Sequence, residues 1–423
     1  MVIVVIFLLL LAVSAPIAVA TGLTTIIAMQ LDNISLTVAA QKMFAGVDSF
    51  SLMAIPFFIF AGDLMLVGGT SKRLINMVNK WVGWTTGGLP IAGVLSSMFF
   101  AALSGSGPAT VAAIGGVMIP SLNEAKYKPK FSVGLMCAAG SLGIIIPPSI
   151  TMLVYGVISE ESISKLFLAG ALPGVFIGLV LIVTSYIIAK KQGHQPGEKA
   201  TWKEIITATR EAIWGIMMPI IVLGGIYWGV FTPTEAAAVA IVYSIFVSMF
   251  IYKEIDVKKL FVVAKKSVVI SSMVMFVIST AKIFSWYLTF QRIPTIVAQH
   301  VLGFATTPFL ILISINILLL FVGMFLDPSA AVLILVPIFL PVLVEVGISP
   351  VHFGVIMIVN LAIGMLTPPF GLNLFVASGI SNMSMTEVTK GALPFIFVLI
   401  AALLVITFVP QLSLFLPEMV YGR

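Results

Sequence analysis

The chain has 423 residues, of which 60% are hydrophobic and only 9% are charged, and its mean hydropathy is +1.19. This composition is typical of an integral membrane protein, so the lipid bilayer is the first partner to expect. The formal net charge of +6 comes from basic residues in short loops, which set membrane orientation and do not indicate a nucleic-acid partner. The single cysteine, Cys137, excludes an internal disulfide.

Continuous apolar runs predict membrane-spanning helices rather than the alternating strands of a barrel, since most of them reach about 20 residues. The predicted spans lie at 2–29, 51–67, 131–158, 166–190, 212–230, 234–252, 260–290, 351–380 and 391–416. No basic segment precedes the first run, so we interpret it as a span rather than a cleaved signal.

Two further runs are interrupted at their centres by small or polar residues. Ser104-Gly105-Ser106-Gly107-Pro108 interrupts the run 89–119, and Asp327-Pro328-Ser329 interrupts the run 309–340. Each run is either one kinked span or a re-entrant hairpin that enters and leaves on one side of the membrane.

The charges of the flanking loops distinguish these alternatives for the run 89–119. The loops on its two sides contain Lys72, Arg73 and Lys80 before it, and Lys126, Lys128 and Lys130 after it. Because basic loops stay in the cytoplasm, both flanks should be cytoplasmic and the run should be a hairpin.

Five predicted spans separate the two hairpins. Because this number is odd, the second hairpin should open from the opposite face of the membrane. Its flanks, 291–307 and 341–350, are accordingly poor in lysine. We therefore expect a single membrane domain over 1–423 that contains an inverted repeat. The first repeat covers about 51–190 and the second about 260–416, with the N-terminus in the cytoplasm and the C-terminus in the periplasm.

A motif that recurs at a fixed distance along the sequence supports the inverted repeat. Gly143, Pro147 and Pro148 in GIIIPPS recur 221 residues later as Gly364, Pro368 and Pro369 in GMLTPPF. The same offset relates Pro120 to Pro341, Glu124 to Glu345, and the segment Gly170-Ala171-Leu172-Pro173 to Gly391-Ala392-Leu393-Pro394. A double proline inside an apolar stretch breaks a helix, and broken helices in matching halves of a membrane protein indicate a transport site. The predicted fold is an all-α polytopic membrane protein with two re-entrant hairpins and two Pro-Pro-broken helices.

Unwound backbone inside a membrane leaves carbonyl groups without helical partners, and bound cations can satisfy them. The groups at the tips and breaks are hard oxygen donors, which suit an alkali or alkaline-earth cation rather than zinc or copper. The candidate cation-binding residues are Ser104, Ser106, Gly143, Ile146, Ser149, Gly323, Asp327, Gly364, Thr367 and Phe370. The candidate substrate-binding residues are Ser106, Thr110, Thr151, Asn373 and Arg292, the last as an attractant for an anionic substrate or a docking partner. The alternative is that these glycines, serines and prolines only permit kinks and tight helix packing.

Few ionisable groups fall inside the predicted spans, and a charge at the bilayer centre costs at least about 2.5–3.5 kcal/mol on insertion scales. We expect Asp327 to be functional, because it lies at a hairpin tip. Asp63 is either a packing partner or a functional group. Glu235 is expected to support a helix start at which Thr234 is the N-cap. The candidate structural or gating residues are Pro147, Pro148, Pro368, Pro369, Glu235 and Asp63.

Several stretches resemble the large membrane subunit of tripartite ATP-independent periplasmic (TRAP) transporters. They are IPFFIFAGDLM (55–65), SGSGPATVAAIGGVMIP (104–120), GIIIPPS (143–149), GGIYWGVFTPTEAAAVA (224–240), DPSAAVLILVPIFLP and GMLTPPFGLNLF. The resemblance implies a sodium-coupled importer of the bacterial inner membrane, in which an elevator motion carries the substrate across. It also implies two protein partners, a small membrane subunit and a periplasmic substrate-binding protein. Its substrates would be carboxylates such as C4-dicarboxylates, sialic acid or other sugar acids. No residue of the sequence distinguishes among these substrates.

Two other classes of protein would share part of this pattern. An ion channel could have hairpins and a carbonyl-lined site, and an intramembrane hydrolase could use Asp63 and Asp327 as a loose aspartyl pair. We expect a transporter rather than an enzyme, with Na⁺ as coupling ion and no organic cofactor. Solute uptake into liposomes, with and without a sodium gradient, distinguishes the three classes.

Overall fold

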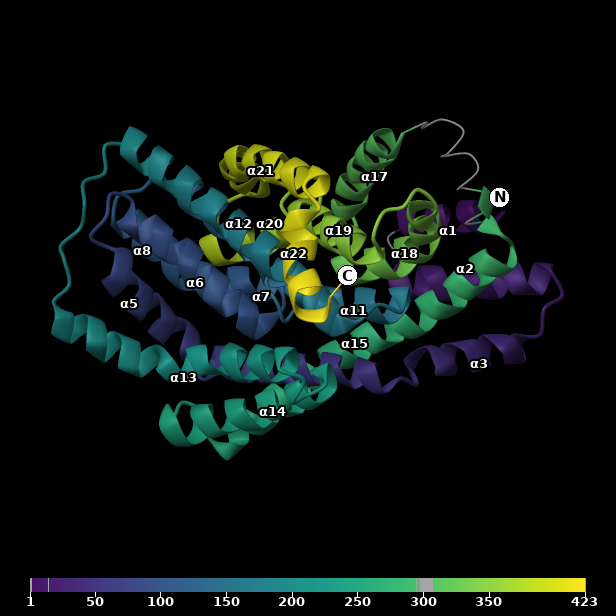
Figure 1. The fold of residues 1–423 in the computed structure, drawn as a ribbon, viewed down its shortest axis with the longest axis horizontal. Helices are drawn as coiled ribbons and strands as arrows, with labels where there is room; N and C mark the ends of the chain where they lie inside the picture. Colours follow the sequence, from purple (N-terminus) through teal and green to yellow (C-terminus); the bar gives the residue numbers. More distant parts are fainter. Residues whose placement is uncertain (1, 14, 294, 297–306, 423) are drawn as a thin grey trace.

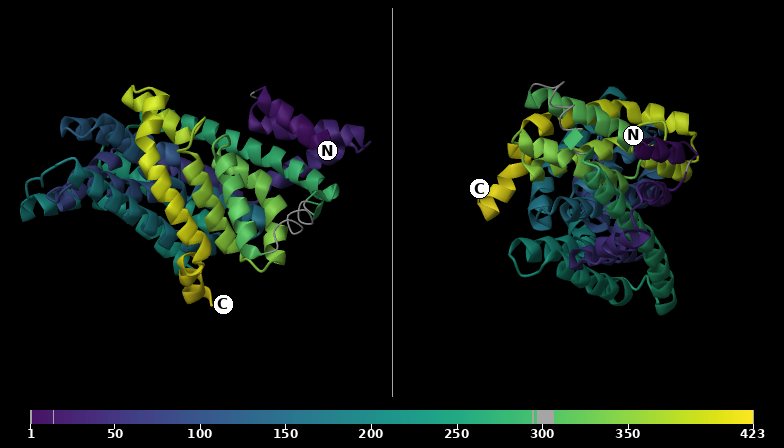
Figure 2. Two further views of the ribbon diagram at one scale, coloured as in Figure 1. Left: turned by 90° about the horizontal axis from the view of Figure 1, so that it is seen from above. Right: turned by 90° about the vertical axis from the view of Figure 1, so that its right-hand side faces the viewer.

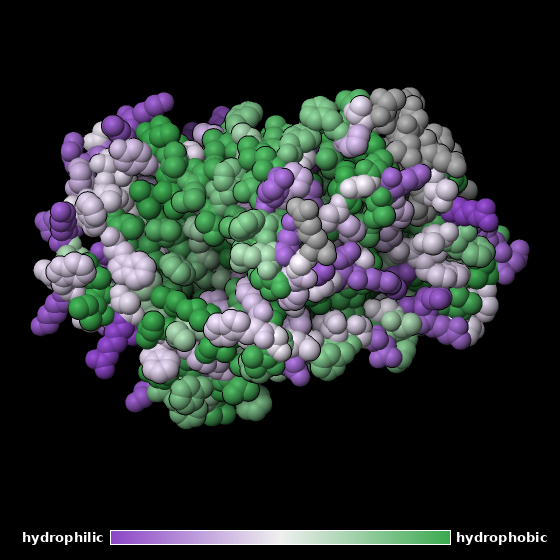
Figure 3. Space-filling model, in the orientation of Figure 1, coloured by the Kyte–Doolittle hydropathy of each residue, from purple (hydrophilic) through white to green (hydrophobic). Residues whose placement is uncertain are grey.

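The computed structural model describes residues 2–13, 15–293, 295–296 and 307–422, and these residues form helices and loops without a strand (Figure 1). Within them, eight helical segments are long and apolar enough to cross a membrane. Apolar surface covers much of the face shown in Figure 3, while hydrophilic residues gather mainly toward its two ends. The all-α membrane fold is therefore confirmed. Most of the predicted lysine-poor flank 291–307 lies outside the described residues.

The prediction of a single span over 2–29 is wrong. The chain forms two helices here, α1 (Val2–Ala12) and α2 (Ile17–Leu31), which are separated at Pro16. Proline has no backbone N–H and clashes with the preceding helical turn, so it ends α1.

The two N-terminal helices fold back on each other against α15 (Val257–Phe290). The ring of Phe7 in α1 lies 5.3 Å from that of Phe284, and Thr21 in α2 shares a 3.1 Å hydrogen bond with Thr280. Since these two α15 residues are one helical turn apart, a continuous helix could not contact both. A cytoplasmic N-terminus would follow if residues 2–29 crossed the membrane once; because they form two helices instead, the orientation of both termini stays a prediction.

The first half of the chain contains two helices that the sequence did not predict, α3 and α5. Its elements are α3 (Leu36–Val47), α4 (Ala54–Val67), α5 (Thr70–Val82), α6 (Gly88–Ser104), α7 (Gly107–Thr110), a π-helical turn (Val111–Gly115), α8 (Gly116–Glu124), α9 (Pro129–Gly140), α10 (Leu142–Ile145), α11 (Ile150–Ser159) and α12 (Ile163–Lys191). The amphipathic α5 buries most of its apolar side chains and exposes Lys72 and Asn76, and a search for continuous apolar runs cannot detect such a helix.

The middle and second half follow the predicted order. The elements are α13 (Trp202–Tyr227), α14 (Pro233–Phe246) with a π-helical extension (Val247–Ile251), α15, α17 (Pro308–Gly323), α18 (Pro328–Glu345), α19 (Pro350–Gly364), α20 (Leu372–Ser381), α21 (Met385–Phe408) and α22 (Gln411–Tyr421). The predicted span 391–416 is corrected, because the helix stops before Pro410 and α22 follows as a separate helix that packs against α12 and carries the C-terminus outward (Figure 2).

Both interrupted runs are hairpins, as predicted. The first consists of α6 and the segment from α7 to α8, which turn at Gly105, and the second consists of α17 and α18. In Figure 1 the first hairpin extends to the left of the centre and the second lies to the right of it, so the tips approach from opposite ends. The helices α13 and α14 lie along the lower edge of the view in Figure 1, where α13 packs mainly against α5.

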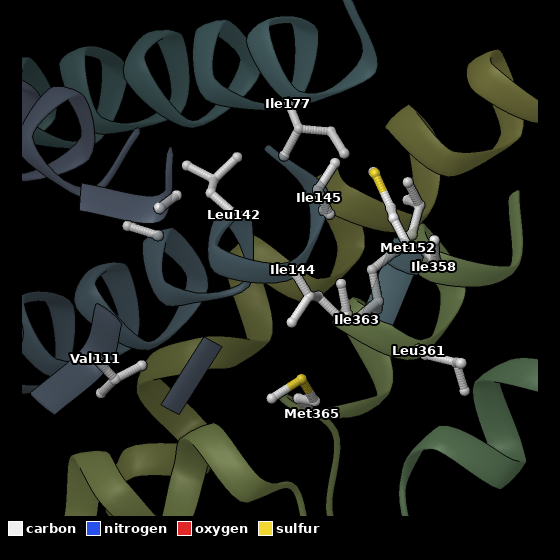
Figure 4. Close-up of a cluster of buried hydrophobic side chains, with 14 of the residues drawn as sticks. Val111, Leu142, Ile144, Ile145, Met152, Ile177, Ile358, Leu361, Ile363 and Met365 are labelled. Atoms are coloured by element: carbon white, nitrogen blue, oxygen red, sulfur yellow. The ribbon is translucent and has the colours of Figure 1, made fainter. Parts of the chain in front are cut away.

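Both predicted helix breaks are also present, at Pro147-Pro148 between α10 and α11 and at Pro368-Pro369 between α19 and α20. Their apolar side chains share one buried cluster. Figure 4 shows Ile144 from the first break close to Ile363 and Met365 from the second. The two halves are thus joined through a common core.

We predict that Gly134→Ala destabilises the protein. A methyl group at Gly134 would clash with the backbone of Gly391, where α9 crosses α21, so the substitution forces the two helices apart. Overpacking of this kind costs about 1–3 kcal/mol, which thermal unfolding of the purified protein should detect. The matched control is Gly379→Ala in α20, where an added methyl group meets nothing within 4 Å. Equal melting temperatures for the two variants would contradict the close crossing.

We also predict that the two hairpins open to opposite faces of the membrane. Glu124 and Glu345 are exposed, are separated by the repeat offset, and end α8 and α18. A cysteine at each position should react with an impermeant maleimide from opposite sides of oriented vesicles. The native Cys137 is buried and provides no competing signal. Labelling of both positions from the same side would exclude the inverted orientation.

Candidate functional site

The tips of the two hairpins meet at a central cavity of about 210 Å³. Its lining comes from both tips, from the first turn of α11, and from α4 and α15. The polar residues of the lining are Asp63, Ser104, Ser106, Thr151, Asp327 and Ser329. The structure therefore brings together residues that the sequence places in both repeats.

The first tip is fixed against the first helix break. Gly105 has a left-handed backbone (φ +58°), and a methyl group on it would lie 3.0 Å from the carbonyl oxygen of Pro148. Both the conformation and the close approach require glycine. The N–H of Ile150 donates to the carbonyl oxygen of Gly105 at 3.4 Å.

Hydroxyl and carbonyl oxygens gather behind this tip. Ser104 and Thr110 share a hydrogen bond of 3.0 Å between their hydroxyls, and the Thr110 hydroxyl also donates to the Ser106 carbonyl at 2.8 Å. The backbone of Gly143 approaches the same carbonyl so closely that a methyl group there would clash with it. Tip and break thus form one oxygen-rich contact.

The remaining predicted residues of the first break have local partners. Ser149 is the N-cap of α11, where its hydroxyl accepts from the Met152 N–H at 3.3 Å and donates to the Ile144 carbonyl at 2.7 Å. Ile146 is half-buried, and Thr151 is buried and lines the cavity.

The second tip is built around Asp327. Its carboxylate caps α18 by accepting from the N–H groups of Ser329 at 2.9 Å and Ala330 at 3.4 Å. Gly364 of the second break approaches Gly323 so closely that a methyl group would clash with its backbone. The side chain of Asp327 remains exposed at the cavity.

A backbone hydrogen bond joins the break to the tip in each half, and its donors occupy corresponding positions. Ile150 donates to Gly105 in the first half, and Gly371 donates to Met324 at 3.2 Å in the second. The two donors are separated by the repeat offset of 221 residues and the two acceptors by 219, so equivalent donors reach similar but not identical positions of the two tips.

The two breaks differ in their exposure. Pro147 and Pro148 are buried, whereas Pro368, Pro369 and Phe370 are exposed, the last to 54%. The hydroxyl of Thr367 donates to the Ile363 carbonyl at 2.9 Å. None of these second-break residues lines the central cavity.

Asn373 reaches from the second half to the first. Its amide nitrogen donates to the Cys137 carbonyl at 3.4 Å, and its buried Oδ1 has no hydrogen-bond partner. That oxygen lies next to Gly107 at the start of α7. The structure therefore places this predicted substrate residue behind the first tip rather than in the cavity lining.

Asp63 faces the cavity from α4, outside both hairpins. The hydroxyl of Ser267 in α15 donates to its Oδ2 at 2.7 Å. Sequence reasoning did not identify Ser267, because the two residues are 204 positions apart and no local pattern links them.

Two predicted residues lie away from the cavity. Arg292 follows the end of α15 and is absent from the lining. Glu235 forms a capping box with Thr232, whose backbone N–H and hydroxyl both donate to its Oε2 at 2.8 Å. The predicted N-cap, Thr234, is wrong, because Pro233 is already helical and Thr232 is the last extended residue.

The fold also resembles that of a solved transporter. The crystal structure of the Alcanivorax borkumensis YdaH transporter matches with a TM-score of 0.66 over 90% of this chain and 89% of that one, at 15% sequence identity. At this identity the similarity supports the fold alone. Together with the spans and the hairpins, it defines a multi-pass, all-helical membrane protein with the fold of a solved transporter.

Sequence comparisons give the family. Residues 4–412 match the family described as "Tripartite ATP-independent periplasmic transporter, DctM component". The C4-dicarboxylate TRAP transporter large permease protein DctM of Pseudomonas aeruginosa is 44% identical, over 94% of this chain and 93% of the relative. The sialic acid TRAP transporter large permease protein SiaM of Vibrio cholerae is 38% identical, over 91% of this chain and 90% of the relative. The isethionate TRAP transporter permease protein DctMQ of Oleidesulfovibrio alaskensis is a longer protein. It is 45% identical, over 97% of this chain and 65% of the relative.

The chain belongs to the DctM family and is a component of a tripartite transporter in the bacterial inner membrane. The resemblance noted from the sequence is thereby confirmed.

Proposed function

We propose that this permease imports a short organic carboxylate together with sodium ions by an elevator motion. The observation that supports it best is the charge of the central cavity. Its lining, which consists of described residues, contains the carboxylates Asp63 and Asp327 and no lysine, arginine or histidine.

An organic anion could not stay in such a cavity without a compensating charge. Two like charges about 4 Å apart repel by roughly 4 kcal/mol at an effective dielectric constant of 20. The first turns of α11 and α18 border the cavity and offer partial positive charge. Ser149 already caps the start of α11 and Asp327 caps that of α18, so bound cations are the main remaining source of attraction.

Sodium fits the donor groups around the tips. The hydroxyls of Ser104 and Thr110 and the carbonyls near Ser106 and Gly143 are neutral, hard oxygen ligands. In the part of the chain that the structure describes, no three His, Cys, Asp or Glu side chains gather as a transition-metal site would require. Sodium would supply positive charge beside the substrate while these oxygens replace its hydration shell.

The size of the cavity favours a small substrate. At about 210 Å³ it falls below the roughly 300–1,000 Å³ of pockets that enclose drug-sized ligands. The relatives named for C4-dicarboxylates and isethionate are 44% and 45% identical to this chain, against 38% for the one named for sialic acid. We therefore place a C4-dicarboxylate first and a sugar acid second.

The contacts between tips and breaks support the elevator motion. Because the Ile150–Gly105 and Gly371–Met324 hydrogen bonds join each hairpin to its own broken helix, hairpin and break would move as one body. The helices α4, α14 and α15 are joined because α4 packs against both of the others, and α13 packs against α14; together they would form the support. A small membrane subunit and a periplasmic binding protein are the proposed partners, and the longer relative named DctMQ supports the first of them.

We predict that uptake requires a sodium gradient. Proteoliposomes that contain this permease and its small subunit, supplied with the binding protein and radiolabelled succinate, should accumulate label when sodium is present outside. Replacing sodium with choline should abolish uptake, and a proton gradient alone should not restore it. Equal uptake in choline would refute sodium coupling.

We predict that Asp327→Asn weakens sodium dependence without unfolding the protein. Asparagine can still cap α18, but it removes one negative charge beside the cation. The sodium concentration for half-maximal uptake should rise roughly tenfold or more, which corresponds to about 1.4 kcal/mol. The control is Asp48→Asn, an exposed carboxylate outside the cavity lining. If Asp327→Asn transports like this control, the carboxylate does not serve the cation.

A further inference from the structure

A second cavity, of about 650 Å³, lies between α5, α13 and the connection from α14 to α15. It shares no residue with the central cavity, and transport as proposed does not use it. The two helices run antiparallel here, because Lys80 near the end of α5 forms a 3.1 Å ion pair with Glu204 near the start of α13.

Cations outnumber carboxylates in this second cavity. Lys72, Arg73 and Arg210 line it together with Glu211 and Glu254. Arg73 is paired with Glu254 at 3.2 Å. Lys72 and Arg210 are exposed and form no ion pair with any residue that the structure describes, so they can bind an anion from outside.

The floor of the cavity is closely packed and hydrogen-bonded. The guanidinium group of Arg73 stacks on the ring of Tyr252 at 4.0 Å and donates to the Gly69 carbonyl at 3.1 Å. Tyr252 is buried, and its hydroxyl donates to the backbone carbonyl of Glu211 at 2.9 Å. These contacts hold α5 and α13 at a fixed separation, so the two unpaired cations project from a preformed site.

Tryptophans indicate that the cavity lies at the level of the lipid headgroups. Trp214 lines it and is 40% exposed. Trp81 donates to the Thr209 hydroxyl at 3.0 Å, and Trp202 at the start of α13 is exposed. Exposed tryptophans collect at the membrane–water interface, where the indole N–H and the apolar ring both find partners.

An apolar stripe extends from this level along α13. Ile206, Ile213 and Ile220 are all exposed and follow one another at seven-residue intervals, which places them on one side of the helix. Such a stripe suits acyl chains, whereas a free phosphate ion would use only the basic end.

We infer that this cavity binds an anionic phospholipid, with its phosphate between Lys72 and Arg210 and its acyl chains along α13. Basic pockets between helices at a membrane surface bind lipid headgroups in this way. The bound lipid would fasten α5, which directly precedes the first hairpin, to the supporting helix α13.

Native mass spectrometry of the permease, alone and with its small subunit, tests this site. The protein is mixed with phosphatidylglycerol or with phosphatidylcholine at equal concentration. Lys72→Ala/Arg210→Ala is compared with Lys128→Ala/Lys258→Ala, which removes two exposed lysines outside the cavity. Removal of two cations from the headgroup should weaken phosphatidylglycerol binding roughly 30-fold. The control pair should bind like the parent, and Arg210→Lys should keep most of the affinity because it keeps the charge.

Four outcomes would overturn the proposal. One is equal binding of the two lipids by the parent, and another is equal phosphatidylglycerol binding by the two double variants. The third is displacement of the lipid by millimolar inorganic phosphate, which would identify a phosphate site instead. Loss of binding when the small subunit is present would assign the cavity to the subunit interface and would also contradict a lipid site.

Discussion

The architecture depends on one constraint, which is that backbone polar groups inside a membrane need partners. Each Pro-Pro break removes helical hydrogen bonds where water is scarce, and a hairpin tip takes their place. Ile150 and Gly371, which follow the two breaks, each donate to the carbonyl of the adjacent tip. The tips can approach so closely because Gly105 and Gly323 carry no side chain. The oxygens near the tips that are left without a helical partner are those proposed to bind sodium. The same helix breaks therefore create both the contact between break and tip and the proposed sodium site.

The hairpins and breaks could be predicted because their signals are local or come from loop charge. A double proline interrupts any helix, and basic loops on both sides of 89–119 exclude a crossing. A single proline is ambiguous, because Pro173 and Pro394 stay inside α12 and α21 while Pro16 separates α1 from α2. The surrounding packing determines whether a single proline ends a helix, and the sequence does not show that packing.

The candidate site was predicted only in part for a similar reason. The offset of 221 residues correctly paired the two breaks, because symmetry relates sequence positions directly. It could not show that Asp63 faces the cavity or that Ser267 holds it, since these belong to α4 and α15 outside the paired tips and breaks. It also could not show that the second break is exposed and that Asn373 lies behind the first tip.

The two carboxylates of the cavity belong to different bodies in the proposed elevator. Asp327 would travel with the second hairpin, while Asp63 stays on α4, where Ser267 orients it. An empty hairpin would therefore carry an uncompensated charge past apolar surface, which costs at least about 2.5–3.5 kcal/mol on insertion scales. A hairpin loaded with cations and an anionic substrate is closer to neutral and avoids that cost. The same carboxylate that attracts sodium would thus oppose movement without it, so coupling in this mechanism needs no separate gate.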